Sequence, residues 1–387
     1  MKWCPHCWES PVNHASYWFQ TSSDIIAQRI HSNRLELVMR AIFDPIIYVV
    51  LYICHRFFKW IGIIRHNTDV KKITSWRAKV LREEAERRGI KMIDIRPFGL
   101  AINLYRAKMK DRDIYYMDMP RPDKFDKNLE RIDDKYLFKK MLIKHKLPHA
   151  KGENFTSLRS AIRYFNTLEK PVIIKPRLWS RSRHTTTGIT DIETFKKAFK
   201  IAKQLCHRVM VEEHLPWAVY RGTVIWGKLV AVLGGTSPQV TGDGKSTIQE
   251  LIDTKNKNKQ EQQGGIKITN TLKDFLSTMD LSLDSVLPKN KSIKISAKSW
   301  VANGGESIDL TDQIHPDTKI MLEEVGKAAD SPIMWLDFMI PDITKSYKQQ
   351  KCGIIECNAA PFIQLHHDVM IGKSINVAKY VWDLVDK

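Results

Sequence analysis

The pattern of apolar and polar residues becomes regular from about residue 76 onward and predicts alternating helices and strands. Apolar residues at helical spacing predict helices over 76–89, 134–146, 157–168, 191–205, 246–258, 316–329 and 373–386. Short apolar runs predict strands over 91–95, 114–117, 171–176, 208–213, 223–225, 229–233, 333–340 and 353–357. This order of helices and strands predicts an α/β (α+β) protein.

Local residues mark several ends of these elements. Gly89 is a helix stop, and Pro316 is a helix start. Gly227 lies between two β-rich runs and predicts the turn of a hairpin. Ser246 with Gln249 has the spacing of a capping box and predicts the start of the helix that runs to 258.

The first 75 residues do not follow this pattern. Residues 1–40 indicate an irregular, aromatic-rich lead, and residues 41–64 form an apolar segment with basic flanks. The uninterrupted apolar run, 45–54, is shorter than the ~20 residues of a spanning helix. Two interpretations stay open for 41–64: a buried element of the N-terminal region, or a membrane-surface or re-entrant helix. We therefore predict three regions: an N-terminal extension (1–75), a small α/β lobe (76–130) and a main domain (131–387).

Composition and charge narrow the class of protein. The chain has 387 residues, 43% hydrophobic and 27% charged, which is a globular balance and not that of a disordered chain. Its formal net charge of +19 attracts phosphates, acidic polymers, anionic lipid or nucleic acid, but the basic residues are spread along the chain. Charge therefore predicts no specific nucleic-acid site. Six cysteines in a chain this long, and the lack of a cleavable signal peptide, favour reduced thiols and a cytoplasmic location, with a peripheral membrane position as the alternative.

One cysteine pair has an informative spacing. Cys4-Pro-His-Cys7 has the spacing of one half of a tetrahedral zinc site, and His14 is a candidate third ligand. No second CxxC follows, so zinc within or between chains, a redox pair and no special role all stay open.

Charged residues in apolar strands suggest the chemistry. Lys139 lies on the helix from 134, and Lys175 ends a buried strand, so both are candidates for binding phosphates. Asp337 interrupts an apolar strand, which is costly unless the carboxylate binds a cation or faces solvent. Glu356 and Asn358 alternate along a second strand and so share one face. Three hard oxygen donors of this kind predict a magnesium site; a surface-facing polar edge is the alternative.

These segments carry a family resemblance. Ile354-Ile-Glu-Cys-Asn-Ala-Ala-Pro361 resembles the metal-binding strand of the ATP-grasp superfamily, and Pro171-Val-Ile-Ile-Lys-Pro176 resembles its phosphate lysine strand. Val209-Met-Val-Glu-Glu-His-Leu215 is similar to its adenine hinge, and Asp134-Lys-Tyr-Leu-Phe-Lys139 to its first lysine helix. Within the superfamily the segments 240–252 and 304–316 are most similar to the ATP-grasp domain of cyanophycin synthetase. No Gly-x-x-x-x-Gly-Lys-Ser/Thr loop occurs, so the second, Mur-ligase-like module of that enzyme is not expected.

The resemblance implies an ATP-grasp fold, with the nucleotide between two α/β lobes, in residues 131–387. It also implies an ATP-dependent carboxylate–amine ligase that forms an amide through an acyl phosphate. ATP and one or two Mg²⁺ ions are the implied cofactors, and a small-molecule or peptide acid and amine are the implied substrates, with an anionic acceptor favoured by the charge. Identity of the substrates and homo-oligomer formation stay open.

The resemblance also implies roles for individual residues. It implies that Lys139 and Lys175 contact the nucleotide phosphates. It also implies that the metal is bound by Asp337, Glu356 and Asn358. In the hinge, Glu212 accepts from the adenine amino group, the backbone at Glu213 lines the ring edge, and Leu215 packs on the ring. The candidate catalytic residues are Arg221, beside phosphate or substrate carboxylate, and Lys298, in the place of a family arginine.

Two departures from the family pattern support an alternative. The stretch 178–188, where the family has a glycine-rich phosphate loop, carries only Gly188, and Arg181 and Arg183 are candidates to replace the backbone contacts. Val219 stands where the family often has an acid for the ribose hydroxyls. The alternative function is a non-catalytic ATP-binding scaffold or sensor, which could act at a membrane surface.

Overall fold

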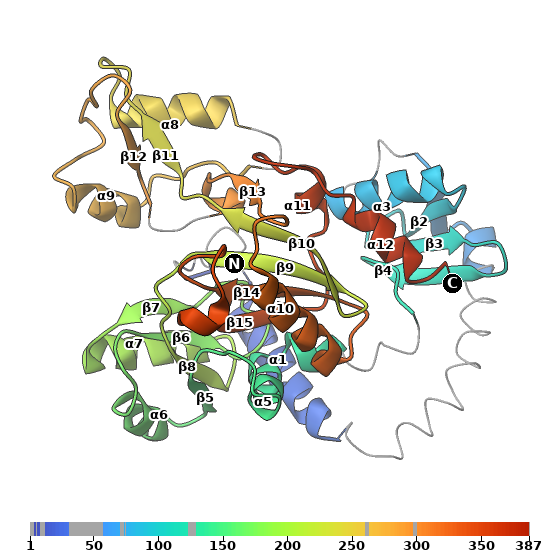
Figure 1. Cartoon of the computed structure of the whole chain (residues 1–387). Helices are drawn as coiled ribbons and strands as arrows, with labels where there is room; N and C mark the ends of the chain where they lie inside the picture. Colours follow the sequence, from blue (N-terminus) through green and yellow to red (C-terminus); the bar gives the residue numbers. More distant parts are fainter. Residues whose placement is uncertain are drawn as a thin grey trace.

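The computed structural model describes most of the chain from residue 57 onward and part of the N-terminal region. The described residues are 4, 6–7, 12–30, 57–69, 73, 75–122, 129–259, 263–296 and 300–386. Four sheets with flanking helices make up this part (Figure 1). The fold is a mixed helix and strand architecture, as the sequence predicts, and the strands pair antiparallel in each sheet.

A five-stranded sheet lies at the centre of the molecule, with the strand order β13-β10-β9-β14-β15. The bounds are β9 Val219–Ile225, β10 Lys228–Gly235, β13 Ser307–Asp309, β14 Ile333–Met339 and β15 Gly353–Asn358. Trp226 and Gly227, both with positive φ, form the predicted hairpin turn. Helix α10 (Pro316–Ala329) packs on this sheet, and a Cβ at Gly326 would lie 2.5 Å from Val224 Cγ1. Glycine is thus required where the helix approaches the sheet most closely.

A four-stranded sheet, in the order β5-β8-β6-β7, forms the second layer of the main domain. Its strands are β5 Gly152–Phe155, β6 Val172–Pro176, β7 Thr186–Ile189 and β8 Val209–Glu213. Helices α6 (Leu158–Phe165) and α7 (Ile192–Lys203) bury Phe165, Phe195 and Phe199 against it. Helices α4 (Leu129–Asp133) and α5 (Lys135–Lys144) run between this sheet and β15.

The small lobe is a sheet of four strands, β1-β2-β3-β4. Helix α3, which precedes β2, covers this sheet together with α11 and α12 from the C-terminal part of the chain. Its elements are β1 Ile64–Asn67, α3 Trp76–Arg87, β2 Lys91–Pro97, β3 Leu104–Lys108, β4 Asp113–Met117, α11 Gln364–His367 and α12 Val377–Asp383. Trp382 of α12 is buried and its Nε1 donates to the Leu81 carbonyl at 2.8 Å. The lobe therefore includes residues from outside the predicted range 76–130, and the closing helix is shorter than the predicted 373–386.

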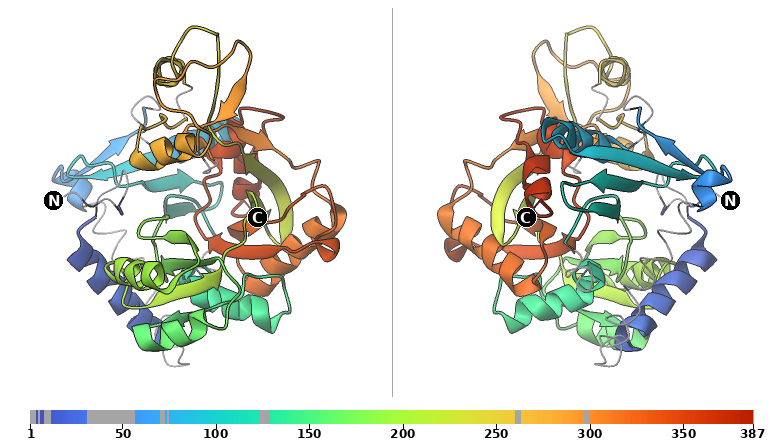
Figure 2. Two further views of the ribbon diagram at one scale, coloured as in Figure 1. Left: turned by 90° about the vertical axis from the view of Figure 1, so that its left-hand side faces the viewer. Right: turned by 90° about the vertical axis from the view of Figure 1, so that its right-hand side faces the viewer.

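A further unit projects from the central sheet, at the end opposite the small lobe (Figures 1 and 2). It contains β11 Gln239–Thr241, α8 Ile248–Lys257, α9 Asn270–Ser277 and β12 Ser292–Lys294 around its own core. Two short 3₁₀ turns, Val301–Asn303 and Tyr347–Gln349, lie outside this unit. The capping box of α8 lies one residue later than predicted. The Thr247 side chain accepts from the Glu250 backbone N–H, and the Glu250 carboxylate accepts from the Thr247 backbone N–H. The Ser246 hydroxyl instead donates to the Asp243 carboxylate.

We expect Thr247→Ala to destabilise α8 by about 1 kcal/mol, because the N-cap oxygen satisfies an otherwise unpaired helix N–H. Backbone amides of α8 should then exchange hydrogen about fivefold faster in the variant. Ser246→Ala is the matched control, and a larger effect from Ser246 than from Thr247 would contradict the assignment of the cap.

The N-terminal lead contains a helix that the sequence reading missed. Residues His14–Ile30 form α1, where the pattern predicted irregular structure. Ile25 packs with Leu178 and Cys206, and Thr21 Oγ1 donates to the Leu205 carbonyl at 2.9 Å, so α1 is fixed to the main domain. Ser, Thr and aromatic residues weaken its helical periodicity, which explains the error.

The apolar segment 41–64 lies largely outside the described residues, which resume at 57. Phe57, Phe58 and Trp60 are exposed. Within the described parts of the chain, no helix has the length and apolar character to cross a membrane.

Candidate active site

Three charged residues meet inside the second layer of the main domain. Lys139 comes from α5, Lys175 from β6 and Glu212 from β8, and all three are buried. Glu212 Oε1 lies 3.1 Å from Lys139 Nζ, and Oε2 lies 2.7 Å from Lys175 Nζ. Lys139 Nζ also donates to the Ala150 carbonyl. The structure thus brings both predicted phosphate lysines together on one carboxylate.

This arrangement shifts the pKa values of its members. Burial alone would raise the pKa of Glu212, but the ammonium groups of Lys139 and Lys175 outweigh it and lower the pKa to about 2. Burial lowers the pKa of Lys139, and Glu212 opposes that shift. Glu212 is therefore ionised near neutral pH and holds the lysines in place.

A buried ion pair between Asp134 and Arg177 fixes α5 beside β6. The sequence analysis does not predict this pair. Asp134 caps α5 through the backbone N–H groups of Tyr136 and Leu137. Its carboxylate also accepts from Arg177, with Nε at 2.9 Å from both oxygens and the terminal nitrogen at 2.7 Å. A paired geometry of this kind is rigid, so the position of Lys139 relative to Lys175 is set by this pair.

The residues of the predicted hinge lie in the last part of β8 and just after it. Glu213 accepts from the Lys151 N–H at 2.8 Å and pairs with Lys351 at 2.9 Å. Leu215 is buried against β15, where a Cβ on Gly353 would lie 2.4 Å from Leu215 Cδ1. The hinge therefore touches both sheets of the main domain.

The three predicted metal ligands lie on β14 and β15 of the central sheet. Asp337 is directly opposite Glu356 in the register, and Asn358 is opposite Trp335. Asp337 Oδ1 lies 3.2 Å from Arg221 Nε and accepts from Trp335 Nε1 at 2.7 Å. Glu356 Oε2 lies 3.4 Å from Lys135 Nζ. Lys135 is a cation of this site that the sequence reading did not single out.

The two carboxylates titrate differently. Burial raises the pKa of Asp337 to about 6; Arg221 opposes the rise, and the charge on Glu356 adds to it. The pKa of Glu356 is lowered, because Lys135 and Lys175 together outweigh its burial. Lys175 belongs to the other sheet, and α5 contacts both groups through Lys135, beside Glu356, and Lys139, beside Glu212. Carboxylate and amide oxygens on adjacent strands, with a carboxylate that lacks full charge compensation, fit a hard divalent cation.

Arg221 is held on β9 by aromatic rings. Its guanidinium carbon lies 3.6 Å from the centre of the Trp300 ring and 5.5 Å from that of Trp335. A Cβ on Gly235 would lie 2.5 Å from Trp300, so the indole packs tightly on β10. Trp300 was not predicted as a site residue, since an isolated tryptophan carries no sequence signal for this role. Lys298 lies outside the described residues.

The stretch 178–188, called here the 178–188 loop, leads from β6 into β7 and includes the first residues of β7. Four non-glycine residues have positive φ there: Trp179, Arg181, Ser182 and His184. Arg183 is buried, donates from Nε to the Ser180 carbonyl and lies over the Tyr17 ring at 5.3 Å, while Arg181 is exposed. Val219 begins β9, opposite Met339. Arg183 thus points into the protein, and this position does not favour the predicted role in which its side chain replaces backbone contacts to the phosphates.

Known ligases resemble this chain in sequence. Cyanophycin synthetase from Crocosphaera subtropica (strain ATCC 51142 / BH68) is 34% identical over 242 residues, which cover 58% of this chain and 28% of that protein. The glutathione biosynthesis bifunctional protein GshAB from Mannheimia succiniciproducens is 31% identical over 255 residues, which cover 63% of this chain and 34% of that protein. The chain therefore spans about a third of the length of these relatives. No family model matches the chain.

A solved structure extends the likeness. The bifunctional glutathione synthetase from Pasteurella multocida superposes with a TM-score of 0.58 and 25% identity, covering 80% of this chain and 43% of that one. Its coverage exceeds that of the sequence relatives, so the likeness extends beyond the segments with recognisable motifs. These likenesses to cyanophycin synthetase and to bifunctional glutathione synthetases confirm the predicted resemblance to the ATP-grasp superfamily.

Proposed function

We propose that this protein is an ATP- and Mg²⁺-dependent ligase that joins a carboxylate to an amine. The observation that carries the proposal is the pairing of two buried lysines with a carboxylate cluster on the facing sheet. Helix α5 links the two groups, because its Lys135 lies 3.4 Å from Glu356 and its Lys139 lies 3.1 Å from Glu212. A triphosphate between them would meet cations on one side and metal-binding oxygens on the other. The relationship to ATP-dependent amide-forming ligases supports the same conclusion.

The reaction is written in two steps. A carboxylate oxygen of the acid attacks the γ-phosphorus of ATP, the bond to the bridging oxygen breaks, and ADP leaves. The amine nitrogen then attacks the acyl carbon, inorganic phosphate leaves with the electron pair, and the amine loses a proton. Asp337, Glu356 and Asn358 would hold magnesium, which would neutralise charge on the phosphates.

The side chains of this chain have separate tasks in that scheme. Lys139 and Lys175 bind phosphate oxygens. Glu212, for which the resemblance implies a bond to the adenine amino group, has its two oxygens paired with these lysines, and we propose instead that it keeps both ammonium groups aligned until the nucleotide enters. Arg221, fixed by Trp300 and Trp335, binds the negative charge that develops on the transferred phosphoryl group or the acid. Glu213 and Leu215 line the adenine slot, and Lys298 is proposed to contact the substrate.

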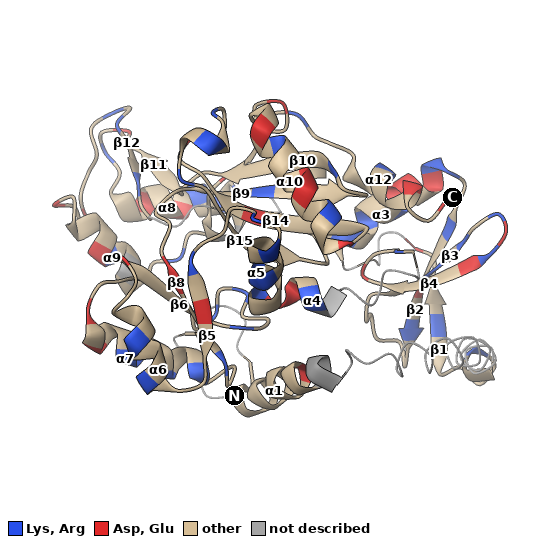
Figure 3. Cartoon of the chain, turned by 60° about the horizontal axis from the view of Figure 1, so that its bottom comes forward, with Lys and Arg blue, Asp and Glu red and all other residues tan. Residues whose placement is uncertain are grey.

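We propose small-molecule or peptide acids and amines as substrates. Lysine and arginine are distributed over several helices and strands of the molecule (Figure 3). A basic surface of this kind favours anionic substrates by long-range attraction. From the sequence we also propose a cytoplasmic location, membrane-surface contact through 41–64 and homo-oligomer formation.

The test is ADP release by the purified chain with ATP and Mg²⁺ against a panel of amino acids and short acidic peptides. We expect ADP only when an acid is supplied, faster release when an amine is added, and a hydroxamate when hydroxylamine replaces the amine. The hydroxamate reports the acyl phosphate, because hydroxylamine attacks the same carbon as the amine.

The altered 178–188 loop and Val219 favour the alternative of a non-catalytic ATP-binding scaffold or sensor. That function predicts Mg²⁺-dependent binding of ATP, measured by calorimetry, without ADP release for any pair in the panel. Such a result would contradict the ligase proposal for those substrates and favour the scaffold.

A further inference from the structure

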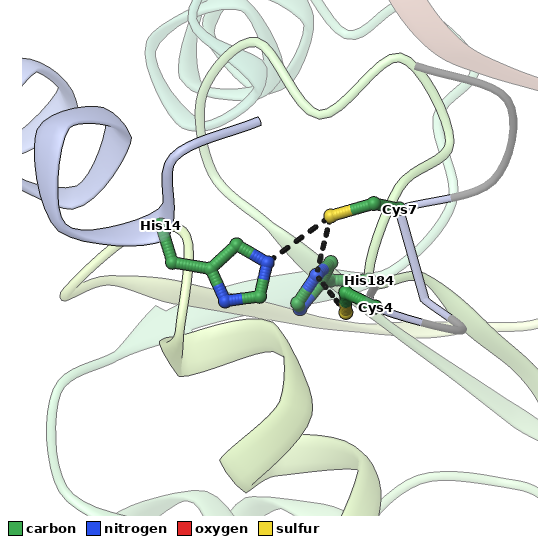
Figure 4. Close-up of side chains that lie close together, drawn as sticks. All are labelled: Cys4, Cys7, His14 and His184. Carbon is green, nitrogen blue, oxygen red and sulfur yellow. Dashed lines mark hydrogen bonds between the residues drawn. The ribbon is translucent and has the colours of Figure 1, made fainter. Parts of the chain in front are cut away.

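Four metal-binding side chains converge outside the ligase site (Figure 4). They are Cys4, Cys7, His14 and His184, and their ligand atoms all lie within 4.8 Å of one another. Cys7 Sγ lies 3.1 Å from His14 Nε2 and 3.4 Å from His184 Nε2, and Cys4 Sγ lies 3.6 Å from His184 Nε2. The cysteines flank the N-terminal turn, His14 begins α1, and His184 comes from the 178–188 loop.

The distances match the coordination shell of a tetrahedral zinc ion. With Zn–S bonds of about 2.3 Å and Zn–N bonds of about 2.05 Å, tetrahedral geometry places sulfur and nitrogen about 3.5 Å apart. The sulfur–nitrogen distances in the cluster fall around this value. Two thiolates with two imidazoles form the Cys₂His₂ set typical of structural zinc, and soft sulfur ligands disfavour Mg²⁺ and Ca²⁺.

The surroundings of the cluster orient the ligands. His184 Nδ1 lies 2.7 Å from the Ile201 carbonyl, which accepts its proton and leaves Nε2 as the ligand atom facing the thiols. His184 and Cys7 are both buried, and the Cys7 N–H donates to the Cys4 carbonyl at 3.1 Å in a tight turn. The His184 N–H in turn donates to the His6 carbonyl at 3.0 Å, so backbone bonds join the two halves of the cluster.

The 178–188 loop is a segment that requires such an anchor. Four non-glycine residues with positive φ each carry a steric cost that tertiary contacts must offset. The N-terminal region supplies these contacts: Tyr17 donates to the Trp179 carbonyl at 2.5 Å, and its ring lies under Arg183. The loop begins three residues after Lys175, so its shape bears on the proposed phosphate site.

We propose that Cys4, Cys7, His14 and His184 bind one structural zinc ion that fastens the N-terminal segment to the 178–188 loop. The metal closes a contact between residues about 180 positions apart and holds a loop that carries only one glycine, Gly188. Three of the four ligands were candidates from the sequence. His184 was not, because it stands alone in sequence and only the fold brings it to the CxxC turn.

The first test is the metal content of the full-length protein, purified after expression with zinc and dialysed against metal-free buffer. We expect about one equivalent of zinc per chain in the unmodified protein and less than a tenth of that in Cys7→Ser and in His184→Ala. His6→Ala is the matched control, because its ring lies 5.6 Å from that of His184 but is not a member of the ligand set, and it should retain the metal.

Replacement of zinc by Co²⁺ gives an independent readout. We expect the intense visible d–d bands of tetrahedral Co²⁺ and a thiolate charge-transfer band, which disappear in Cys7→Ser. Circular dichroism establishes that each variant is folded, and Cys4→Ser, at the more exposed thiol, replaces Cys7→Ser if that variant fails to fold.

Hydrogen exchange connects the metal to the loop. Chelation of the zinc should raise exchange over 178–188 and over α1 at least tenfold, and leave β14 and β15 unchanged. A folded protein without zinc, a Cys4–Cys7 disulfide in place of the metal, or equal zinc in Cys7→Ser would overturn the proposal. Each of these results is independent of whether the protein proves to be a ligase.

Discussion

Glu356→Gln and Asp337→Asn should each lower ATP-dependent ligation by about 10³-fold. Either substitution keeps the size of the side chain and removes one negative charge from the carboxylate pair on β14 and β15. The remaining oxygens would bind a divalent cation more weakly, and the phosphoryl group would lose charge neutralisation in the transition state. Initial rates of ADP and amide formation over a wide range of Mg²⁺ concentration measure the effect.

The matched control is Asp342→Asn. Asp342 lies just beyond β14, is half-exposed and bonds to Thr344 and Lys345, so its replacement should change the rate less than twofold. Variants of Asp337 and Glu356 that retained more than a tenth of the normal rate would show that the trio does not bind the catalytic metal. Loss of the rate in Asp342→Asn to the same extent would indicate a general structural effect.

Much of this site follows from the sequence because its elements have strong local signals. An acid in an apolar strand and two polar residues at alternate positions predict β14 and β15, and strand geometry then places Glu356 and Asn358 on one face. Lys175 was recognised in the same way, as a cation at the end of a buried strand. The elements that carry these residues lie within a few residues of their predicted ends.

The missed features depend on contacts between distant parts of the chain. Lys135 reaches Glu356 only when α5 lies against β15, and Arg177 reaches Asp134 only when β6 ends at the start of α5. Trp300 stacks on Arg221 from a connection after β12. No spacing rule along the sequence reports pairs of this kind, since their partners are set by the order of strands in the two sheets.

The N-terminal region shows the same limit. The CxxC spacing marks Cys4 and Cys7, whereas the helix α1 and the approach of His184 to these cysteines are not predictable from local pattern. The stretch 178–188 was interpreted by comparison with a glycine-rich phosphate loop. The structure adds a contact that the sequence does not predict, because Tyr17 of α1 bonds to the Trp179 carbonyl and lies beside Arg183.

Glu212→Gln should reduce the free energy of unfolding by about 3 to 5 kcal/mol in the absence of nucleotide. The substitution leaves Lys139 and Lys175 buried beside each other without a compensating charge, and removal of one partner from a buried ion pair has this cost. Protection factors of the β6 and β8 amides, from hydrogen exchange normalised to unprotected peptides, should fall at least 100-fold. Glu213→Gln is the adjacent control: its partner Lys351 is largely exposed, and the expected cost is at most about 1 kcal/mol.

The pH dependence of stability separates this charge effect from a packing defect. The pKa of Glu212 is about 2 in the folded chain, against an ordinary value of 4.5, so its ionisation contributes about 3 kcal/mol of stability above pH 4.5. That contribution is lost as the pH falls toward 2, because the unfolded chain then binds a proton that the folded chain does not. We therefore expect the stability difference between the unmodified protein and Glu212→Gln to be full at pH 7 and to shrink by more than half by pH 3. A difference that stays constant over this range would show that the variant is destabilised by altered packing and not by the loss of a carboxylate between two lysines.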